Sequence, residues 1–174
     1  MKNRIKHNPI ARVKLRISSE VLNFIEVQSA KSTRVETGGI IAGNGSLESG
    51  GVLITHASDP GPKAVRRYGF FLRDVAYCQS VLDRWVAESG GAVDYIGEWH
   101  KHFETEPRPS HQDIETMQNI AASTDYHVSR AVLLIIGRSN SRRSLRTFVA
   151  NTQGGMEQVE WEEVTGESLQ YSPY

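Results

Sequence analysis

The chain has 174 residues, which is enough for one domain with a sizeable hydrophobic core. Its 20 basic and 20 acidic residues cancel at neutral pH, so net charge does not favour a nucleic-acid partner. No apolar run is long enough to span a bilayer, and the single cysteine, Cys78, excludes an internal disulfide, so we expect a cytoplasmic protein with no membrane partner.

Charge is unevenly distributed at the two ends. Residues 1–16 carry basic side chains and no acidic one, whereas residues 157–167 carry acidic side chains and no basic one. The basic start lacks the apolar segment of a secretory signal. The simplest interpretation is a pair of solvated strand faces and a tail. The alternative is a pair of docking surfaces for protein partners.

The first half of the chain is predicted to alternate strands and helices. Ser18 or Ser19 is suited to cap a helix, and Asn44-Gly45 indicates a turn. The expected elements are a half-buried strand at residues 12–17, a helix at 20–32, a buried strand opened by glycines at 37–43, a strand at 52–57 and a short strand at 68–71.

The second half continues the alternation. The run at 131–136 is almost wholly apolar, so we expect it inside a sheet. This order predicts a mixed α/β fold in one domain. The expected elements are a helix from Asp74 to about Gly90, a strand at 93–100, a loop at 103–109, a helix from Ser110, the apolar strand, and closing strands at 144–150 and 156–161.

Two histidines and an aspartate form a candidate metal site. His100 and His102 lie two apart on a predicted strand, so their side chains point to the same face. Asp113 lies in the first turn of the next predicted helix, within reach of that strand's end. Two imidazole nitrogens and one carboxylate oxygen suit Zn²⁺, and three protein ligands leave a position for a catalytic water.

Two further side chains complete a hydrolytic site. Glu36 stands directly before a Gly-Gly strand, an unusual place for a carboxylate that serves packing alone, and is the candidate general base. Ser110 is the candidate donor to the oxyanion that forms after attack. Ser110 and Asp113 also have the spacing of a helix capping box, and capping alone remains the alternative for Ser110.

Glu36, His100-x-His102, Ser110 and Asp113 together resemble the JAMM motif of the JAB/MPN metalloproteases. The resemblance implies a JAB/MPN-like (cytidine-deaminase-like) domain over residues 11–165, with a central, mostly antiparallel sheet flanked by helices. It leaves residues 1–10 as an extension and 166–174 as a tail. It also implies that Glu36 is the acid/base, that the histidines and Asp113 bind zinc, and that Ser110 stabilises the tetrahedral intermediate.

The family hydrolyses amide or isopeptide bonds after the C-terminus of ubiquitin-like proteins. Short bacterial members look most similar, including the deconjugating enzymes of CBASS antiviral operons and enzymes that process sulfur-carrier proteins. The implied substrate is a ubiquitin-like or conjugated protein with an extended tail, and a conjugating enzyme or nucleotide cyclase is an implied partner. Lys101 and Phe103 depart from the usual Ser or Thr and Pro, which puts substrate fit in question.

Other interpretations stay open. Glu98 shares the face of the ligands and could orient one of them, or be a surface charge. His100-x-His102 followed by Glu106 has the first-motif spacing of cupins, which resemble β-barrels. A non-catalytic scaffold of the JAB/MPN fold is the alternative to an enzyme. Trp99 and Cys78 are expected to be core residues.

Overall fold

The computed structural model describes residues 15–47, 50–150 and 154–166. The expected N-terminal extension, most of the basic run and the tail beyond Gly166 lie outside the described residues, so the predicted domain limits stay a prediction. The strands are β1 (Leu15–Ser18), β2 (Gly38–Ser46), β3 (Gly51–Ala57), β4 (Val65–Arg67), β5 (Phe70–Leu72), β6 (Asp94–Lys101), β7 (Val132–Ile136), β8 (Leu145–Ala150), β9 (Met156–Val159) and β10 (Trp161–Val164). The helices are α1 (Ser19–Lys31), α2 (Val75–Glu88) and α3 (His111–Ala122), with 3₁₀ turns η1 (Thr124–Tyr126) and η2 (Arg142–Ser144).

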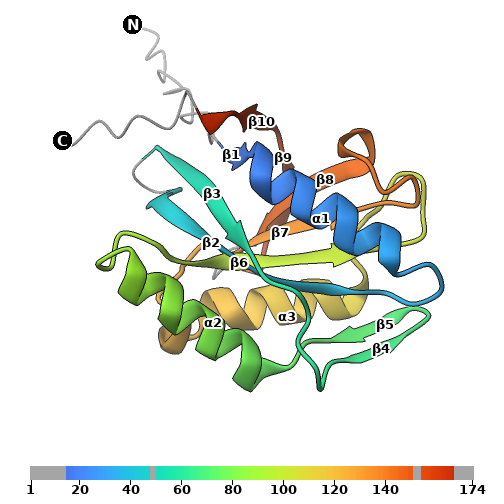
Figure 1. Cartoon of the computed structure of the whole chain (residues 1–174), viewed down its shortest axis with the longest axis horizontal. Helices are drawn as coiled ribbons and strands as arrows, with labels where there is room; N and C mark the ends of the chain where they lie inside the picture. The colour runs from blue at the N-terminus through green and yellow to red at the C-terminus, as the bar shows by residue number, and fades with distance from the viewer. Residues whose placement is uncertain (1–14, 48–49, 151–153, 167–174) are drawn as a thin grey trace, which may run out of the picture.

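One mixed sheet organises the molecule (Figure 1). Its eight strands follow the order β10-β1-β3-β2-β6-β7-β8-β9, and β4 pairs with β5 in a separate hairpin. Among the described pairings, β1 runs parallel to β10 and β3, and β6 runs parallel to β7, while the remaining four in the large sheet are antiparallel. The prediction of a mixed α/β fold with a mostly antiparallel central sheet is therefore confirmed.

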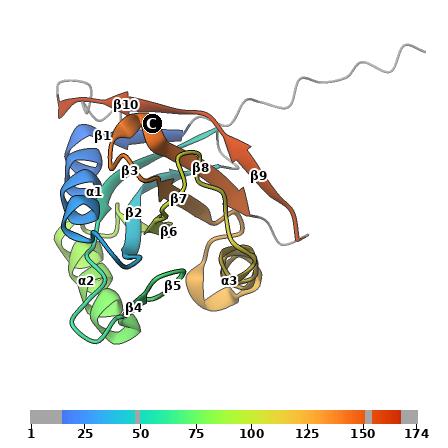
Figure 2. The ribbon, with the colours of Figure 1, turned by 90° about the vertical axis from the view of Figure 1, so that its right-hand side faces the viewer.

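Helices cover both faces of this sheet (Figure 2). Helix α1 packs over one face, and α2 and α3 lie against the other. On β7, Leu134 belongs to the apolar cluster beneath α1, whereas Leu133 and Ile135 belong to the cluster beneath α2 and α3. Burial on both faces explains why this strand is apolar throughout, as predicted. Within the described residues, no helix is both long and apolar enough to cross a membrane.

A β-bulge in β6 sets which side chains reach which face. Gly97 pairs with Ile41, but Tyr95 pairs with the next residue of β2, so Ile96 is an extra residue. A bulge reverses the alternation of side chains beyond it. Tyr95 consequently shares the α2–α3 face with Glu98 and His100, while Ile96 and Trp99 pack in the α1 cluster.

Local details differ from the sequence prediction in several places, and strand β4 is one of the elements that were not predicted. Asn44 and Gly45 do not form the turn, because β2 continues to pair with β3 as far as Ser46. Tyr68 and Gly69 are not in a strand but connect β4 to β5. Strand β10 was not predicted as a separate strand; it pairs with β1 at the edge of the sheet opposite β9.

The predicted helix starts are confirmed. Ser18, Asp74 and Ser110 are the N-caps of α1, α2 and α3, and each side chain accepts a hydrogen bond from a backbone N–H in the first turn. These bonds satisfy donors that a helix start leaves without partners. The cap at Ser110 fixes where α3 begins, and so where Asp113 lies.

Candidate metal centre and active site

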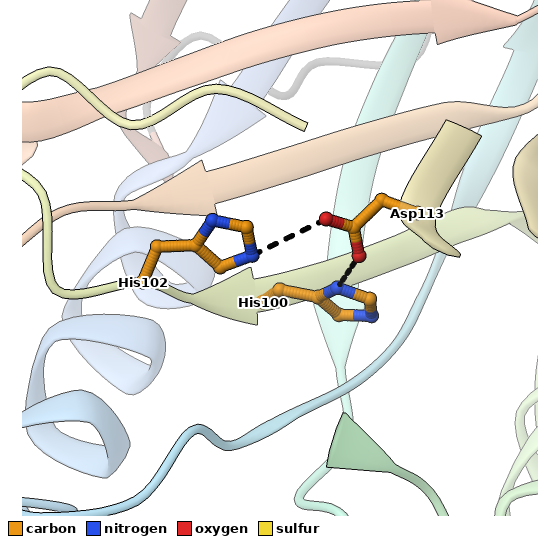
Figure 3. A group of neighbouring side chains, drawn as sticks. All are labelled: His100, His102 and Asp113. Atoms are coloured by element: carbon orange, nitrogen blue, oxygen red, sulfur yellow. Dashed lines mark hydrogen bonds and ion pairs between the residues drawn. The ribbon is translucent and has the colours of Figure 1, made fainter. Parts of the chain in front are cut away.

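The three predicted metal ligands come together (Figure 3). His100 lies near the end of β6, His102 directly follows that strand, and Asp113 lies in the first turn of α3. The Nδ1 atom of His100 is 2.8 Å from Oδ1 of Asp113, and Nε2 of His102 is 3.3 Å from Oδ2 of the same carboxylate. All three side chains are buried, with exposed fractions of 5–7%.

This donor set fits a zinc ion. Tetrahedral zinc with bonds of about 2.0–2.1 Å holds its ligand atoms about 3.3–3.4 Å apart. One ligand atom from each of His100, His102 and Asp113 lies within 4.8 Å of the others, so small side-chain rotations would bring all three to one ion. Buried imidazoles facing a carboxylate with no apolar packing between them are the chemistry that such an ion requires.

Ser110 both caps α3 and faces the ligands. Its hydroxyl accepts from the N–H of Asp113 at 3.1 Å and donates to Oδ2 of Asp113 at 2.7 Å. The N–H of Ser110 donates to the same Oδ2 at 2.7 Å, which completes the capping box. The capping role is therefore confirmed, and these bonds orient the Asp113 carboxylate toward the histidines. An oxyanion role requires the hydroxyl to turn toward substrate, and stays a proposal.

Glu98 is not a surface charge but a buried partner of His100. Its Oε2 lies 3.1 Å from Nε2 of His100, and its Oε1 accepts from Nε of Arg73 at 2.7 Å. The side chains of Glu98 and Arg73 are 5% and 9% exposed. Arg73 also reaches the hydroxyl of Tyr126 at 3.4 Å. A carboxylate on the second nitrogen fixes the tautomer and orientation of a metal-binding histidine.

Sequence reasoning did not find Arg73. It precedes the N-cap of α2 and lies 25 positions before Glu98, and no motif joins the two residues. Only the fold brings them together, because the β4–β5 hairpin delivers this segment to the face of the sheet that carries Glu98 and His100. A buried carboxylate needs a compensating charge, which is the one signal that could have prompted a search for a basic residue.

Glu36 shares a cavity with two of the three predicted metal ligands. The cavity has a volume of about 380 Å³. Its lining includes Glu36, Phe71 of β5, His102, Ser110 and Asp113. The N–H of Glu36 donates to the carbonyl of Arg67 in β4 at 3.0 Å, so the hairpin helps to hold this position. The predicted base thus faces the same space as His102 and Asp113, while His100 lines a neighbouring cavity together with Glu98 and Asp113.

Burial and charge set the protonation of these groups. Burial raises the pKa of the Glu36 carboxyl, the nearby His102 opposes this, and the negative charge of Asp113 adds to it. Burial also acts against an ionised Asp113, but its hydrogen bonds with His100 and His102 hold the pKa of its carboxyl well below the usual value. Likewise, hydrogen bonds to Asp113 and Glu98 outweigh burial and raise the pKa of His100 to about 9. A metal ion must displace that proton to bind.

The neighbouring residues of the motif have structural roles. Trp99 is fully buried and donates from Nε1 to the carbonyl of Ser58 at 2.8 Å, and Cys78 is buried, as expected for core residues. Phe103 stacks on Tyr68 with ring centroids 5.4 Å apart.

The acidic run near the end of the chain makes ion pairs within the protein. Glu157 pairs with Arg130, and Glu163 pairs with Arg142 and accepts a hydrogen bond from the hydroxyl of Ser19.

The family follows from a match between residues 19–149 and the family described as prokaryotic homologues of the JAB domain. That stretch covers most of the chain and all the residues of the candidate site. The chain belongs to the prokaryotic JAB family. The cupin interpretation is wrong, because His100 and His102 lie on a mixed sheet flanked by helices rather than in a β-barrel.

Individual relatives of this JAB-family chain agree with the family assignment. A "CD-NTase/cGAS isopeptidase" of Enterobacter hormaechei subsp. hoffmannii is 32% identical over 122 residues, which covers 70% of this chain and 66% of the relative, just under two thirds of its length. A "Probable metalloprotease y4qB" of Sinorhizobium fredii is 32% identical over 103 residues, covering 59% of this chain and 62% of the relative. The solved structure of a JAB1/MPN domain protein from Archaeoglobus fulgidus is similar in fold, with a TM-score of 0.50. The match covers 87% of this chain and 98% of the Archaeoglobus chain. At 16% sequence identity, it shows likeness of fold alone.

Proposed function

We propose that this protein is a zinc-dependent isopeptidase or peptidase that cleaves the bond after the C-terminal residue of a ubiquitin-like protein or of a protein conjugated by a ubiquitin-like system. Family membership supports a hydrolase. The observation that carries the proposal is the convergence of His100, His102 and Asp113 beside the cavity that holds Glu36. His102, Asp113 and Ser110 line this cavity together with Glu36. The name of the Sinorhizobium relative, a probable metalloprotease, agrees with a metal at this site.

The residues divide the chemistry among them. His100, His102 and Asp113 would hold the zinc ion, which when bound supplies a more acidic water and a positive charge beside the substrate carbonyl. Glu36 accepts the proton of the attacking water and passes it to the leaving amine. Its raised carboxyl pKa brings it nearer to neutral pH, where a group that must both take and give a proton works best. Ser110 donates to the developing oxyanion.

The substrate tail is proposed to lie in the cavity beside Glu36. Pro109 lines this cavity, but Gly38 and Gly39 of the Gly-rich strand do not. Its walls come instead from Gly69 to Phe71 of the hairpin and from Arg108 to Ser110. We propose that a cavity bounded on two sides by these segments accepts an extended tail that ends in small residues. Fusions ending in glycine should therefore be cleaved faster than fusions ending in a bulky residue, and equal rates would remove this part of the proposal.

The setting we propose is bacterial antiviral defence of the CBASS type. The name of the Enterobacter relative specifies CD-NTase/cGAS, which supports a conjugate of such a nucleotidyltransferase as the substrate. The activity test therefore uses a panel of conjugates: a CD-NTase conjugate, a ubiquitin-like protein linked to lysine, and a sulfur-carrier protein fused to a C-terminal extension. Cleavage of the sulfur-carrier fusion alone would favour precursor processing instead.

Glu36→Gln is the deciding variant, and Asp113→Asn is its control. Glu36→Gln should retain one zinc per chain and lose turnover by about 10²–10⁴-fold, because only the proton acceptor is removed. Asp113→Asn should lose both zinc and activity, and a zinc chelator should inactivate the wild type until zinc is restored. Full activity of Glu36→Gln would refute the mechanism. Wild-type protein without stoichiometric zinc would favour a non-catalytic scaffold.

A further inference from the structure

Lys101 separates the two histidine ligands in sequence but points away from them. His100 and His102 face α3, so the intervening side chain projects to the α1 face of the sheet. Lys101 is only 2% exposed, and its ammonium group therefore lies inside the protein. Burying this charge costs free energy that an apolar side chain of the same length would avoid. The ammonium group of Lys101 is therefore expected to bond to acceptors inside the protein.

Backbone carbonyls at the end of α1 accept from Lys101. Its Nζ atom donates to the carbonyl of Ser29 at 2.8 Å and to that of Ser32, the C-cap, at 2.5 Å. The last turn of a helix leaves carbonyls without partners and carries partial negative charge, so a cation there is stabilising. Nζ also lies 5.3 Å from the centroid of the Phe103 ring. Lys101 thus fastens the end of α1 to the strand that carries the ligands.

The backbone N–H of Lys101 holds the other end of the segment that joins α1 to β2. Its N–H donates to the carbonyl of Thr37 at 2.8 Å. The segment from Ser32 to Thr37 joins α1 to β2 at the end of the sheet where the β4–β5 hairpin lies (Figure 1). Glu36 is in this segment. One residue, placed between the two histidines, therefore holds both ends of the short connection that carries the proposed base.

From these contacts we infer that Lys101 is a positioning residue that sets Glu36 at a fixed place relative to His100 and His102. The inference rests on the proposed function for the role of Glu36, and on the structure for the contacts. The ammonium of Lys101 acts through the end of α1 and does not touch the substrate. Its effect is to limit motion of residues 32–37, since a base displaced by about 1 Å can lose on the order of a hundredfold in rate.

The test replaces Lys101 with methionine, which is unbranched, shorter by one atom, and has no donor. Lys101→Met should lower kcat on the lysine-linked ubiquitin-like conjugate by about tenfold to a hundredfold. KM and zinc affinity should stay within about twofold, because the three ligands and the cavity residues outside segment 32–37 are unchanged. Hydrogen exchange in a peptide spanning residues 32–38 should become faster. Lys101→Arg, which keeps a cationic donor, should restore most of the rate and the protection.

Arg142→Met is the matched control, because it removes a different anchor of α1. Arg142 bonds Glu26 and Asn23, in the middle of the helix and away from Glu36. This variant should be less stable yet keep kcat and the slow exchange of residues 32–38. Equal loss of kcat in both variants would overturn the inference, and so would unchanged exchange of residues 32–38 in Lys101→Met. If Lys101→Met fails to fold, Lys101→Gln against Lys101→Arg makes the same comparison.

The two proposals can fail separately. If the wild-type protein binds zinc but cleaves none of the conjugates, the proposed function fails, and hydrogen exchange still decides whether Lys101 holds residues 32–37. If the wild type is active and Lys101→Met keeps full kcat, the proposed function stands and the positioning role of Lys101 is wrong.

Discussion

Glutamine in place of Glu98 tests whether the metal centre extends beyond its three ligands. The change keeps the shape of the side chain but removes the charge that meets Nε2 of His100 and Nε of Arg73. Loss of a carboxylate that orients a metal-binding histidine typically weakens metal affinity by about 10–100-fold. We therefore expect Glu98→Gln to bind zinc about 10–100-fold more weakly, which corresponds to about 1.4–2.7 kcal/mol.

The same change should also destabilise the fold. Arg73 is 9% exposed and would keep its charge with no carboxylate beside it. Removal of one partner of a buried ion pair costs about 3–5 kcal/mol. The double variant Arg73→Met/Glu98→Gln removes both charges, so most of that stability should return. Zinc affinity should stay weak in the double variant, because His100 still lacks its carboxylate.

Two measurements separate these effects. Urea denaturation of the metal-free proteins reports stability, and competition with a chelator of known affinity reports zinc binding. Wild-type zinc affinity in both the single and the double variant would refute the reasoning. Recovery of stability and affinity together in the double variant would mean that Glu98 serves the fold alone and does not tune His100.

Two further predictions concern Ser110 and Gly38. Ser110→Ala should lower kcat by about 10²–10³-fold with a smaller change in KM, and lower stability by about 1 kcal/mol through loss of the cap; equal changes in kcat and KM in steady-state assays would argue against an oxyanion role. A Cβ at Gly38 would lie 2.3 Å from the carbonyl of Trp99 and 2.9 Å from the ring of His100, so Gly38→Ala should cost at least about 1–3 kcal/mol in urea denaturation. Gly166→Ala, where no atom lies within 4 Å, is its control and should leave stability unchanged.

Local signals were enough to predict most of the elements and the side chains that converge. Helix starts at Ser18, Asp74 and Ser110 depend on a hydrogen bond within one turn, so they can be read from neighbouring residues. Strand alternation likewise predicts that the side chains of His100 and His102 point to the same face of the sheet. Asp113 was predictable because its place is counted from the cap at Ser110.

Features that depend on distant parts of the chain were missed. Strand β10 forms by pairing with β1, the first described strand, and the sequence of β10 alone does not indicate that pairing. Arg73 meets Glu98 only after the hairpin folds across the sheet. Lys101 was noted only as a departure from the usual Ser or Thr, because its bonds to the carbonyls of Ser29 and Ser32 join parts of the chain about 70 residues apart. Each case is decided by tertiary contacts rather than by local preference.

The extra residue at Ile96 has a consequence for how this strand can vary. From Gly97 onward the side chains of β6 alternate between two buried faces: Glu98 and His100 meet the layer of α2 and α3, and Trp99 and Lys101 lie on the side of α1. A gain or loss of one position between Gly97 and His100 would exchange the two faces and turn Lys101 toward α3 in place of the imidazoles, whereas loss of Ile96 would leave a regular strand with Tyr95, Glu98 and His100 on their present face. Single changes of length are therefore excluded between Gly97 and His100, and Ile96 is a position where a change of length keeps the two faces.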